Sequence, residues 1–214
     1  MSPEITLDAD GTVTGNTYDK YNTTNPVAKR LQAGFEKNLA ELLELADPAT
    51  LLDVGCGEGV LTHQWAQRPS MKRIVGIDLP DESVQKHWAD RQAPNLEYQL
   101  LKLTEENSPL PFKDAEFEAA TAIEVLEHVP DPEYTASEMA RCASKWVLVS
   151  VPREPIWRVT NMARGAYWKH LGNSPGHLNH WSKHSFKKLW SQHGQVIEAR
   201  SPYPWTMLLV DISK

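Results

Sequence analysis

The chain has 214 residues, of which 41% are hydrophobic, and a formal net charge of −6 at pH 7. This length suits a single domain over residues 1–214 with a sizeable core, and the acidic balance argues against general nucleic-acid binding. No apolar run approaches the roughly 18 residues of a membrane span, the polar N-terminus is unlike a secretory signal, and two cysteines are too few for a disulfide framework, so we expect a cytoplasmic protein.

Helices and strands alternate along most of the chain. Residues 1–25 are expected to form a flexible arm, and Pro48 ends the first predicted helix. In chain order the predicted elements are helix 26–46, strand 51–54, helix 60–67, strand 73–78, helix 82–91, strands 96–103 and 117–123, helix 132–142, strand 146–151, a helix after Ser182, and strands 196–201 and 206–212. This alternation indicates an α/β fold with a mostly parallel sheet, which binds ligands at the carboxyl ends of its strands.

The stretch LLDVGCGEG, residues 51–59, is a strand that runs into a glycine turn. Its glycines, Gly55, Gly57 and Gly59, fall at every second position. Glycines in such a turn let backbone N–H groups approach a bound ligand closely. The spacing differs from the G-x-G-x-x-G of the usual dinucleotide site, in which the third glycine would stand at Val60.

Two aspartates lie at the ends of predicted strands, next to the expected ligand site. Asp78 ends the second predicted strand, 25 residues after Asp53, which lies beside the glycine turn. A carboxylate in the position of Asp78 can accept both ribose hydroxyls of a nucleoside ligand. The glycine turn and the aspartate pair together predict a nucleoside-containing cofactor.

The motifs LLDVGCGEG, GIDLP, an LPF loop and IEVLEHVPDPE occur in an order that resembles class I S-adenosylmethionine (SAM) methyltransferases over about residues 50–152. The resemblance implies a Rossmann-like fold, a seven-stranded sheet with its last strand antiparallel, and SAM as cofactor. Glu124 would border the methyl-donor end, and Asp53 would meet the methionine ammonium. Leu103 would contact adenine, because the third strand runs into Leu103 and Thr104 where family members often have an acidic residue. The implied cofactor-binding residues are Asp53, Gly55, Gly57, Gly59, Asp78, Leu79, Leu103, Glu124 and, from an arm that closes over SAM, Tyr21.

The segment from Glu124 to His128 carries groups for the reaction itself. If it forms a helical turn, Glu124, Glu127 and His128 share one face. An oxygen nucleophile must lose its proton, and His128 is the first candidate for the general base, with Glu124 and His180 as further catalytic candidates. The alternative is structural, with Glu127 and His128 bonded to loop backbone.

A metal-dependent interpretation also stays open. The segment resembles the E-x-x-E-H-H motif of small-RNA 2′-O-methyltransferases, which has a later histidine and holds a divalent cation. Here Val129 replaces the second histidine of the motif, and His180 is the best placed of the later histidines. Because one ligand is missing and the chain is acidic, we expect no metal.

Residues 152–181 interrupt the alternation and are predicted to be an inserted substrate lid. The wider segment 153–188 holds seven Lys or Arg residues and one acid. A helix over 155–171 would carry an apolar stripe and basic residues elsewhere, which suits a plain lid, a membrane-facing helix or a site for an anionic substrate. The region also resembles the ubiquinone-pathway O-methyltransferases, which act on lipid-bearing phenols.

From these observations we expect a SAM-dependent methyltransferase that acts on an oxygen of a small or lipid-linked molecule. Nucleic acid is not favoured as a partner, and contact of segment 153–188 with a membrane surface is one expectation for the lid. The alternatives are a metal-dependent RNA 2′-O-methyltransferase and a SAM-binding accessory subunit without catalysis.

Overall fold

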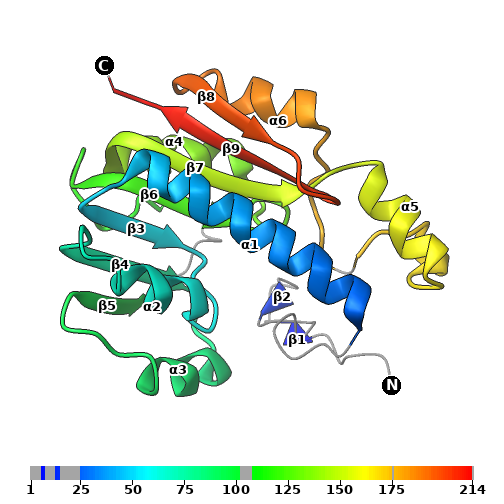
Figure 1. Ribbon diagram of the computed structural model, residues 1–214, viewed down its shortest axis with the longest axis horizontal. Helices are drawn as coiled ribbons and strands as arrows, with labels where there is room; N and C mark the ends of the chain where they lie inside the picture. Colours follow the sequence, from blue (N-terminus) through cyan, green and yellow to red (C-terminus); the bar gives the residue numbers. More distant parts are fainter. Residues whose placement is uncertain (1–5, 8–12, 15–24, 102–107, 175, 214) are drawn as a thin grey trace.

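The centre of the molecule is a seven-stranded sheet in the order β5-β4-β3-β6-β7-β9-β8, seen in a computed structural model that describes residues 6–7, 13–14, 25–101, 108–174 and 176–213 (Figure 1). Within this sheet β9 alone runs antiparallel to its neighbours, which confirms the predicted fold. The strands are β3 (Thr50–Val54), β4 (Arg73–Asp78), β5 (Leu96–Leu100), β6 (Phe117–Ile123), β7 (Ala143–Pro152), β8 (Gln195–Arg200) and β9 (Trp205–Asp211); β1 (Thr6–Leu7) and β2 (Val13–Thr14) form a separate pair.

Helices cover both faces of this sheet (Figure 1). The helices of the described residues are α1 (Pro26–Ala46), α2 (Val60–Ala66), α3 (Glu82–Ala89), α4 (Pro132–Cys142), α5 (Ile156–Ala163) and α6 (Lys183–Trp190), with a 3-10 turn, η1 (Trp168–His170). Leu51 of β3 packs into one core cluster with α1 and α2, whereas Leu52 packs into a second cluster with α4 and α6. This is the side-chain alternation of a strand buried on both faces.

Helix α1 begins and ends where the sequence predicts. The Asn25 side chain accepts hydrogen bonds from the backbone N–H groups of Val27 and Ala28, and Pro26 takes the first helical position, which needs no N–H. At the other end Asp47 adopts a left-handed conformation, and its N–H bonds to the Leu43 carbonyl. No helix within the described residues is long and apolar enough to cross a membrane.

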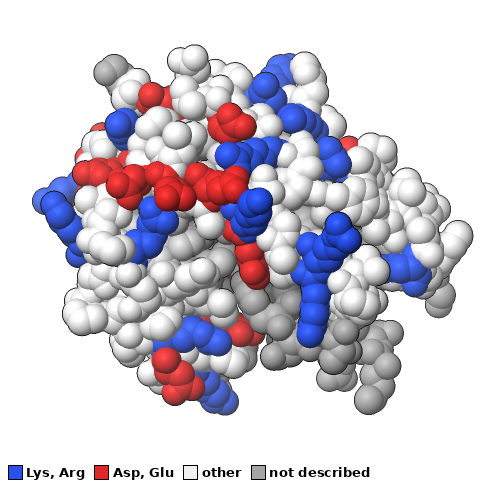
Figure 2. All heavy atoms as spheres, viewed as in Figure 1, with Lys and Arg blue, Asp and Glu red and all other residues white. Residues whose placement is uncertain are grey.

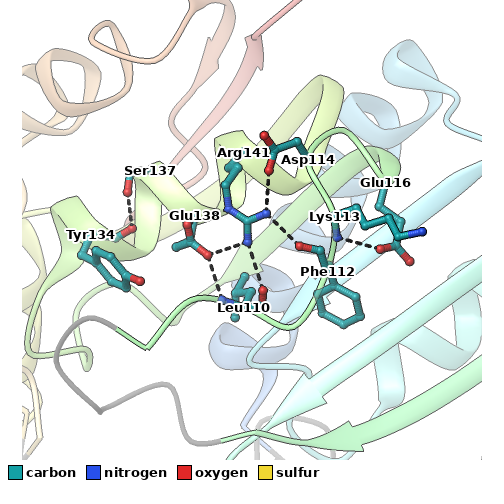
Figure 3. A network of polar contacts seen from close by, with 9 residues as sticks. All are labelled: Leu110, Phe112, Lys113, Asp114, Glu116, Tyr134, Ser137, Glu138 and Arg141. Atoms are coloured by element: carbon teal, nitrogen blue, oxygen red, sulfur yellow. Dashed lines mark hydrogen bonds and ion pairs between the residues drawn. The ribbon is translucent and has the colours of Figure 1, made fainter.

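The LPF loop is anchored by one arginine of α4 (Figure 3). Arg141 donates to the carbonyls of Leu110 and Phe112 at 3.0 and 2.7 Å, to Asp114, and to both carboxylate oxygens of Glu138. The Glu138 carboxylate also accepts from the Leu110 N–H at 2.8 Å, and Arg141 lowers the pKa of Glu138. This network holds the loop at the entrance to β6, so the LPF motif has a structural role here.

Several predicted boundaries are wrong, among them the start of β7, which lies at Ala143 rather than at residue 146. Two of the differences have a clear physical reason. Strand β5 ends at Leu100 rather than at residue 103, because it pairs only with β4, whose last residue, Asp78, lies opposite Leu100. The single helix expected over 155–171 ends at residue 163, because Gly165 adopts a φ of +80° that a helix does not accept. The chain then turns into η1, and α5 protrudes from the body of the molecule (Figure 1).

Candidate active site

The glycine turn lies between the carboxyl end of β3 and the start of α2. Gly55, Gly57 and Gly59 all have positive φ, at 72°, 54° and 76°. A Cβ atom would collide with Val125 at Gly55 and with the Tyr98 ring at Gly59, but at Gly57 it would meet no heavy atom of the described residues within 4 Å. Packing therefore requires two of the glycines, while the third presents bare backbone to open space.

Aromatic and basic side chains hold this turn from outside. The Trp88 indole donates to the Gly57 carbonyl at 2.8 Å, Arg91 donates to the Glu58 carbonyl at 2.9 Å, and the Tyr98 hydroxyl donates to the Gly59 carbonyl at 3.3 Å. Trp88 and Tyr98 stack with ring centroids 4.7 Å apart. These residues were not predicted from the sequence, where an aromatic in a helix or a strand has no mark that separates it from a core residue.

Asp78, at the end of the neighbouring strand β4, is hydrogen-bonded to the glycine turn. Its carboxylate accepts from the Gly57 N–H through a short hydrogen bond and from the Leu79 N–H at 2.7 Å. Burial raises the pKa of this carboxyl, while the two backbone N–H groups act in the opposite direction. The carboxylate thus shapes the glycine turn, and its contact with ribose stays a prediction.

Asp53 is buried under the same turn, with 3% of its surface exposed. Thr62 of α2 donates to one carboxylate oxygen at 2.6 Å, and Thr121 of β6 donates to the other at 2.8 Å. Burial, with a smaller contribution from the charge of Asp78, raises its pKa to about 6 despite these two hydrogen bonds. The two oxygens therefore link β3 to α2 and β6. The expected contact of Asp53 with the methionine ammonium stays a prediction.

Glu124 follows β6 with a φ of 60°, which is uncommon for a residue with a side chain. Its backbone N–H donates to the Ser150 carbonyl at 3.1 Å. The Ser150 hydroxyl donates to one of its carboxylate oxygens at 3.1 Å, and the Trp205 indole donates to the other at 2.6 Å. A pocket opens here, and its lining includes Gln32, Phe35, Asp53, Gly55, Cys56, Gly57, Glu58, Val60, Leu61, Ile123, Glu124 and Trp205.

His128 lies one turn further along, against the lid. Its Nδ1 atom is 2.9 Å from the Gly176 carbonyl oxygen. Because a carbonyl only accepts, Nδ1 carries the proton, and in the neutral ring Nε2 keeps its lone pair. Nε2 lies 4.0 Å from the carboxylate of Glu127, which is 1% exposed. This tautomer suits the general base that the sequence predicts.

The structure brings His177 beside His128, with ring centroids 4.9 Å apart. Glu127, His128 and His177 each offer a ligand atom, and these atoms lie within 4.8 Å of one another. His180, which the sequence favoured, instead bonds to the Asn173 side chain at 2.8 Å, and burial lowers its pKa. The role predicted for His180 stays a prediction, whereas the histidine placed at the Glu127–His128 turn is His177.

The segment 152–181, predicted to be a lid, is held together by its own hydrogen bonds and contacts residues at both ends of the site. Asn161 of α5 donates to the Gly172 carbonyl at 2.8 Å, and the Trp157 indole donates to the Ser174 hydroxyl at 2.9 Å. The Trp157 ring stacks on His177 at 5.9 Å and lies 6.1 Å from the ring of Trp205. Tyr21 and Leu103, predicted at the cofactor, lie outside the described residues.

Comparisons with known proteins identify a methyltransferase domain in this chain. A family profile described as "Methyltransferase domain" matches residues 27–199. Curated relatives named ubiquinone biosynthesis O-methyltransferase include those of Albidiferax ferrireducens, 37% identical over 97 residues, and Pasteurella multocida, 28% identical over 155 residues. These alignments cover 44% and 61% of this chain, and the chain spans only 35% and 62% of the relatives' own lengths.

Solved structures share the fold. Magnesium protoporphyrin IX methyltransferase from Synechocystis PCC 6803 with bound SAH has a TM-score of 0.66 at 15% identity, over 90% of each chain. The methyltransferase domain of bacterial CtHen1-C has a TM-score of 0.60 at 20% identity, over 86% of this chain and all of the other. At these identities the likeness concerns the fold alone.

The residues around the turn fit SAM as the methyl donor. Gly57 leaves room for a ligand against the backbone, Asp78 stands at the adjacent strand end, and Glu124 lines the pocket in front of them. The family profile covers most of the chain. The chain therefore belongs to the methyltransferase domain family.

Proposed function

We propose that the protein transfers the methyl group of SAM to an acceptor oxygen on a small or lipid-linked molecule. The acceptor oxygen would attack the methyl carbon, the carbon–sulfur bond would break with its electron pair on sulfur, and the acceptor proton would pass to Nε2 of His128. The products are the methyl ether and S-adenosylhomocysteine (SAH). The observation that carries the proposal is the His128 ring, whose Nδ1 atom donates to Gly176 and leaves Nε2 as a base.

The test is methyl transfer to a panel of phenols, with and without a prenyl chain, by His128→Gln. We expect kcat to fall by about 100-fold or more near pH 7, with binding of SAM unchanged. His193→Gln, beyond α6, is the matched control and should keep kcat within about twofold. Equal kcat for His128→Gln and the original protein on an accepted phenol would refute the role of His128.

The lid supports a lipid-linked acceptor and a membrane surface nearby. Val159, Trp168, Leu171 and Leu178 expose 57%, 62%, 70% and 57% of their surface. Figure 2 shows the protruding segment on the right mostly in white with basic side chains. Exposed apolar side chains beside basic residues suit an anionic bilayer surface. The relatives' names, which concern ubiquinone biosynthesis, agree with such an acceptor.

This membrane contact is tested by co-sedimentation with vesicles that contain anionic lipid. We expect binding that weakens severalfold when Trp168 and Leu171 are both replaced by Ser, while SAM binding is retained. Leu45→Ser on α1, which is 56% exposed, is the matched control. Binding that is unchanged in the double variant would contradict the proposal.

We also propose a cytoplasmic location, in keeping with the free thiols of Cys56 and Cys142.

A second candidate function is metal-dependent methylation of an RNA 2′-oxygen. The grouping of Glu127, His128 and His177 within 4.8 Å favours it, because carboxylate and imidazole together suit Mn²⁺ and related ions. Methyl transfer to RNA that EDTA abolishes and Mn²⁺ restores would replace the first proposal. An accessory role without catalysis would instead show SAM binding and no methyl transfer to any acceptor tested.

A further inference from the structure

One wall of the donor pocket combines a carboxylate with aromatic rings. Glu124, Phe35 and Trp205 all line the pocket. The Phe35 and Trp205 rings meet edge to face, with centroids 4.9 Å apart at 64°. These residues come from α1, β9 and the end of β6, which are far apart in the sequence and converge only through the fold.

The Glu124 carboxylate in this wall has a fixed orientation. Trp205 donates to one of its oxygens and Ser150 donates to the other, while the backbone is held at a φ of 60° by a hydrogen bond to Ser150. A conformation of this kind persists only where its surroundings enforce it, and such positions cluster at functional sites. The single N–H of the Trp205 ring is used on Glu124, so the rest of the indole offers only carbon surface to a ligand.

We propose that Glu124 and Trp205, with Phe35, recognise the positive charge of the sulfonium group and thereby distinguish SAM from SAH. A sulfonium has no N–H or O–H to donate, so it cannot be held by hydrogen bonds. It is stabilised by a nearby negative charge and by the faces of aromatic rings. The inference rests on SAM as methyl donor and is independent of the acceptor.

The same wall then favours product release. Transfer of the methyl group leaves a neutral thioether, so the attraction to Glu124 and to the aromatic rings disappears in the step that forms the product. The methionine ammonium is present in both SAM and SAH and does not distinguish them. A residue that binds the ammonium would therefore affect both ligands equally, and this difference separates the two roles.

Isothermal titration calorimetry with SAM and SAH tests the proposal. We expect Glu124→Gln, which keeps the size and the hydrogen-bond acceptor, to weaken SAM about tenfold while SAH stays within about twofold. Trp205→Phe should weaken SAM about threefold with the same selectivity. Sinefungin, which carries a charged amine in place of the methylated sulfur, should follow SAM.

Glu118→Gln is the matched control, because it removes one carboxylate from an exposed position near the start of β6, the strand that Glu124 follows. It should change neither affinity by more than about twofold. Retained SAH binding shows that each variant is folded. Equal weakening of SAM and SAH by Glu124→Gln, or no weakening of SAM, would overturn the proposal. If the original protein bound neither ligand, the assignment of the methyl donor would fail and the proposal with it.

Discussion

Asp53→Asn is expected to remove a pH-dependent cost to stability. The pKa of Asp53 rises from 3.8 to about 6 on folding, chiefly because the carboxyl is buried. A carboxyl with a raised folded-state pKa binds its proton more tightly in the native state, so it disfavours folding as pH rises. The cost begins near the unfolded pKa and is complete above the folded one. At ~1.4 kcal/mol per pKa unit, the ionised group costs about 3 kcal/mol.

The assay is urea denaturation of Asp53→Asn and the original protein between about pH 4 and pH 7.5. Linkage predicts that the difference in unfolding free energy between the variant and the original protein grows by about 2 kcal/mol over this range. Groups that do not interact with Asp53 titrate alike in both proteins and cancel in the difference, and Asp78 is the neighbour that does interact. A difference that is flat, or that falls as pH rises, would refute the reasoning.

Asp47→Asn provides a control of opposite sign. Hydrogen bonds from Ser70 and Arg68 lower the pKa of this exposed carboxyl. Its contribution to stability is therefore present above the unfolded pKa and is lost as pH falls. The free-energy difference for Asp47→Asn should change with pH in the direction opposite to that for Asp53→Asn.

Three further predictions concern the turn, the loop and the lid. Gly59→Ala should destabilise the protein by about 3 kcal/mol or more, because the new Cβ meets the Tyr98 ring. Gly57→Ala should cost only ~1–2 kcal/mol, because its positive φ is the sole penalty, and thermal denaturation of the two variants measures the difference. Arg141→Met should cost about 3 kcal/mol in urea denaturation, since it leaves the Glu138 carboxylate buried, and Glu138→Gln added to it should recover part of this loss. Asn161→Ala should lower kcat several-fold with the Kd for SAM unchanged, because it frees the lid.

The sheet and its turn could be predicted because their signals are local. The glycine turn needs a positive φ at three positions, and the bounds of α1, β4, β6 and α4 follow from apolar periodicity, proline and capping residues. The single helix expected in the lid was wrong because Gly165 interrupts it, although the apolar periodicity continues beyond that residue. Apolar periodicity indicates which face of a helix would be buried, but it does not show where the helix ends. Here the left-handed conformation of Gly165 prevents the helix from continuing.

The side chains that complete the site come from long-range packing. Trp205 reaches Glu124 because β9 inserts beside β7, and no local pattern marks this tryptophan among the eight in the chain. His177 meets His128 because the lid returns across the Glu127–His128 turn, where Leu178 and Asn179 bond to the Glu127 carbonyl. The sequence spacing of histidines alone favoured His180, since it contains no information about that return.

The position of Trp157 would link the two halves of the proposed reaction. Its ring stacks on His177, which borders the candidate base, and also lies near Trp205, which orients Glu124 in the donor pocket. A lid that moves must therefore disturb the acceptor end and the donor end together. Hydrogen bonds from Trp157 and Asn161 to the Ser174 hydroxyl hold this part of the segment together. Ordering of the lid by an acceptor would then position the base and enclose the sulfonium in one step.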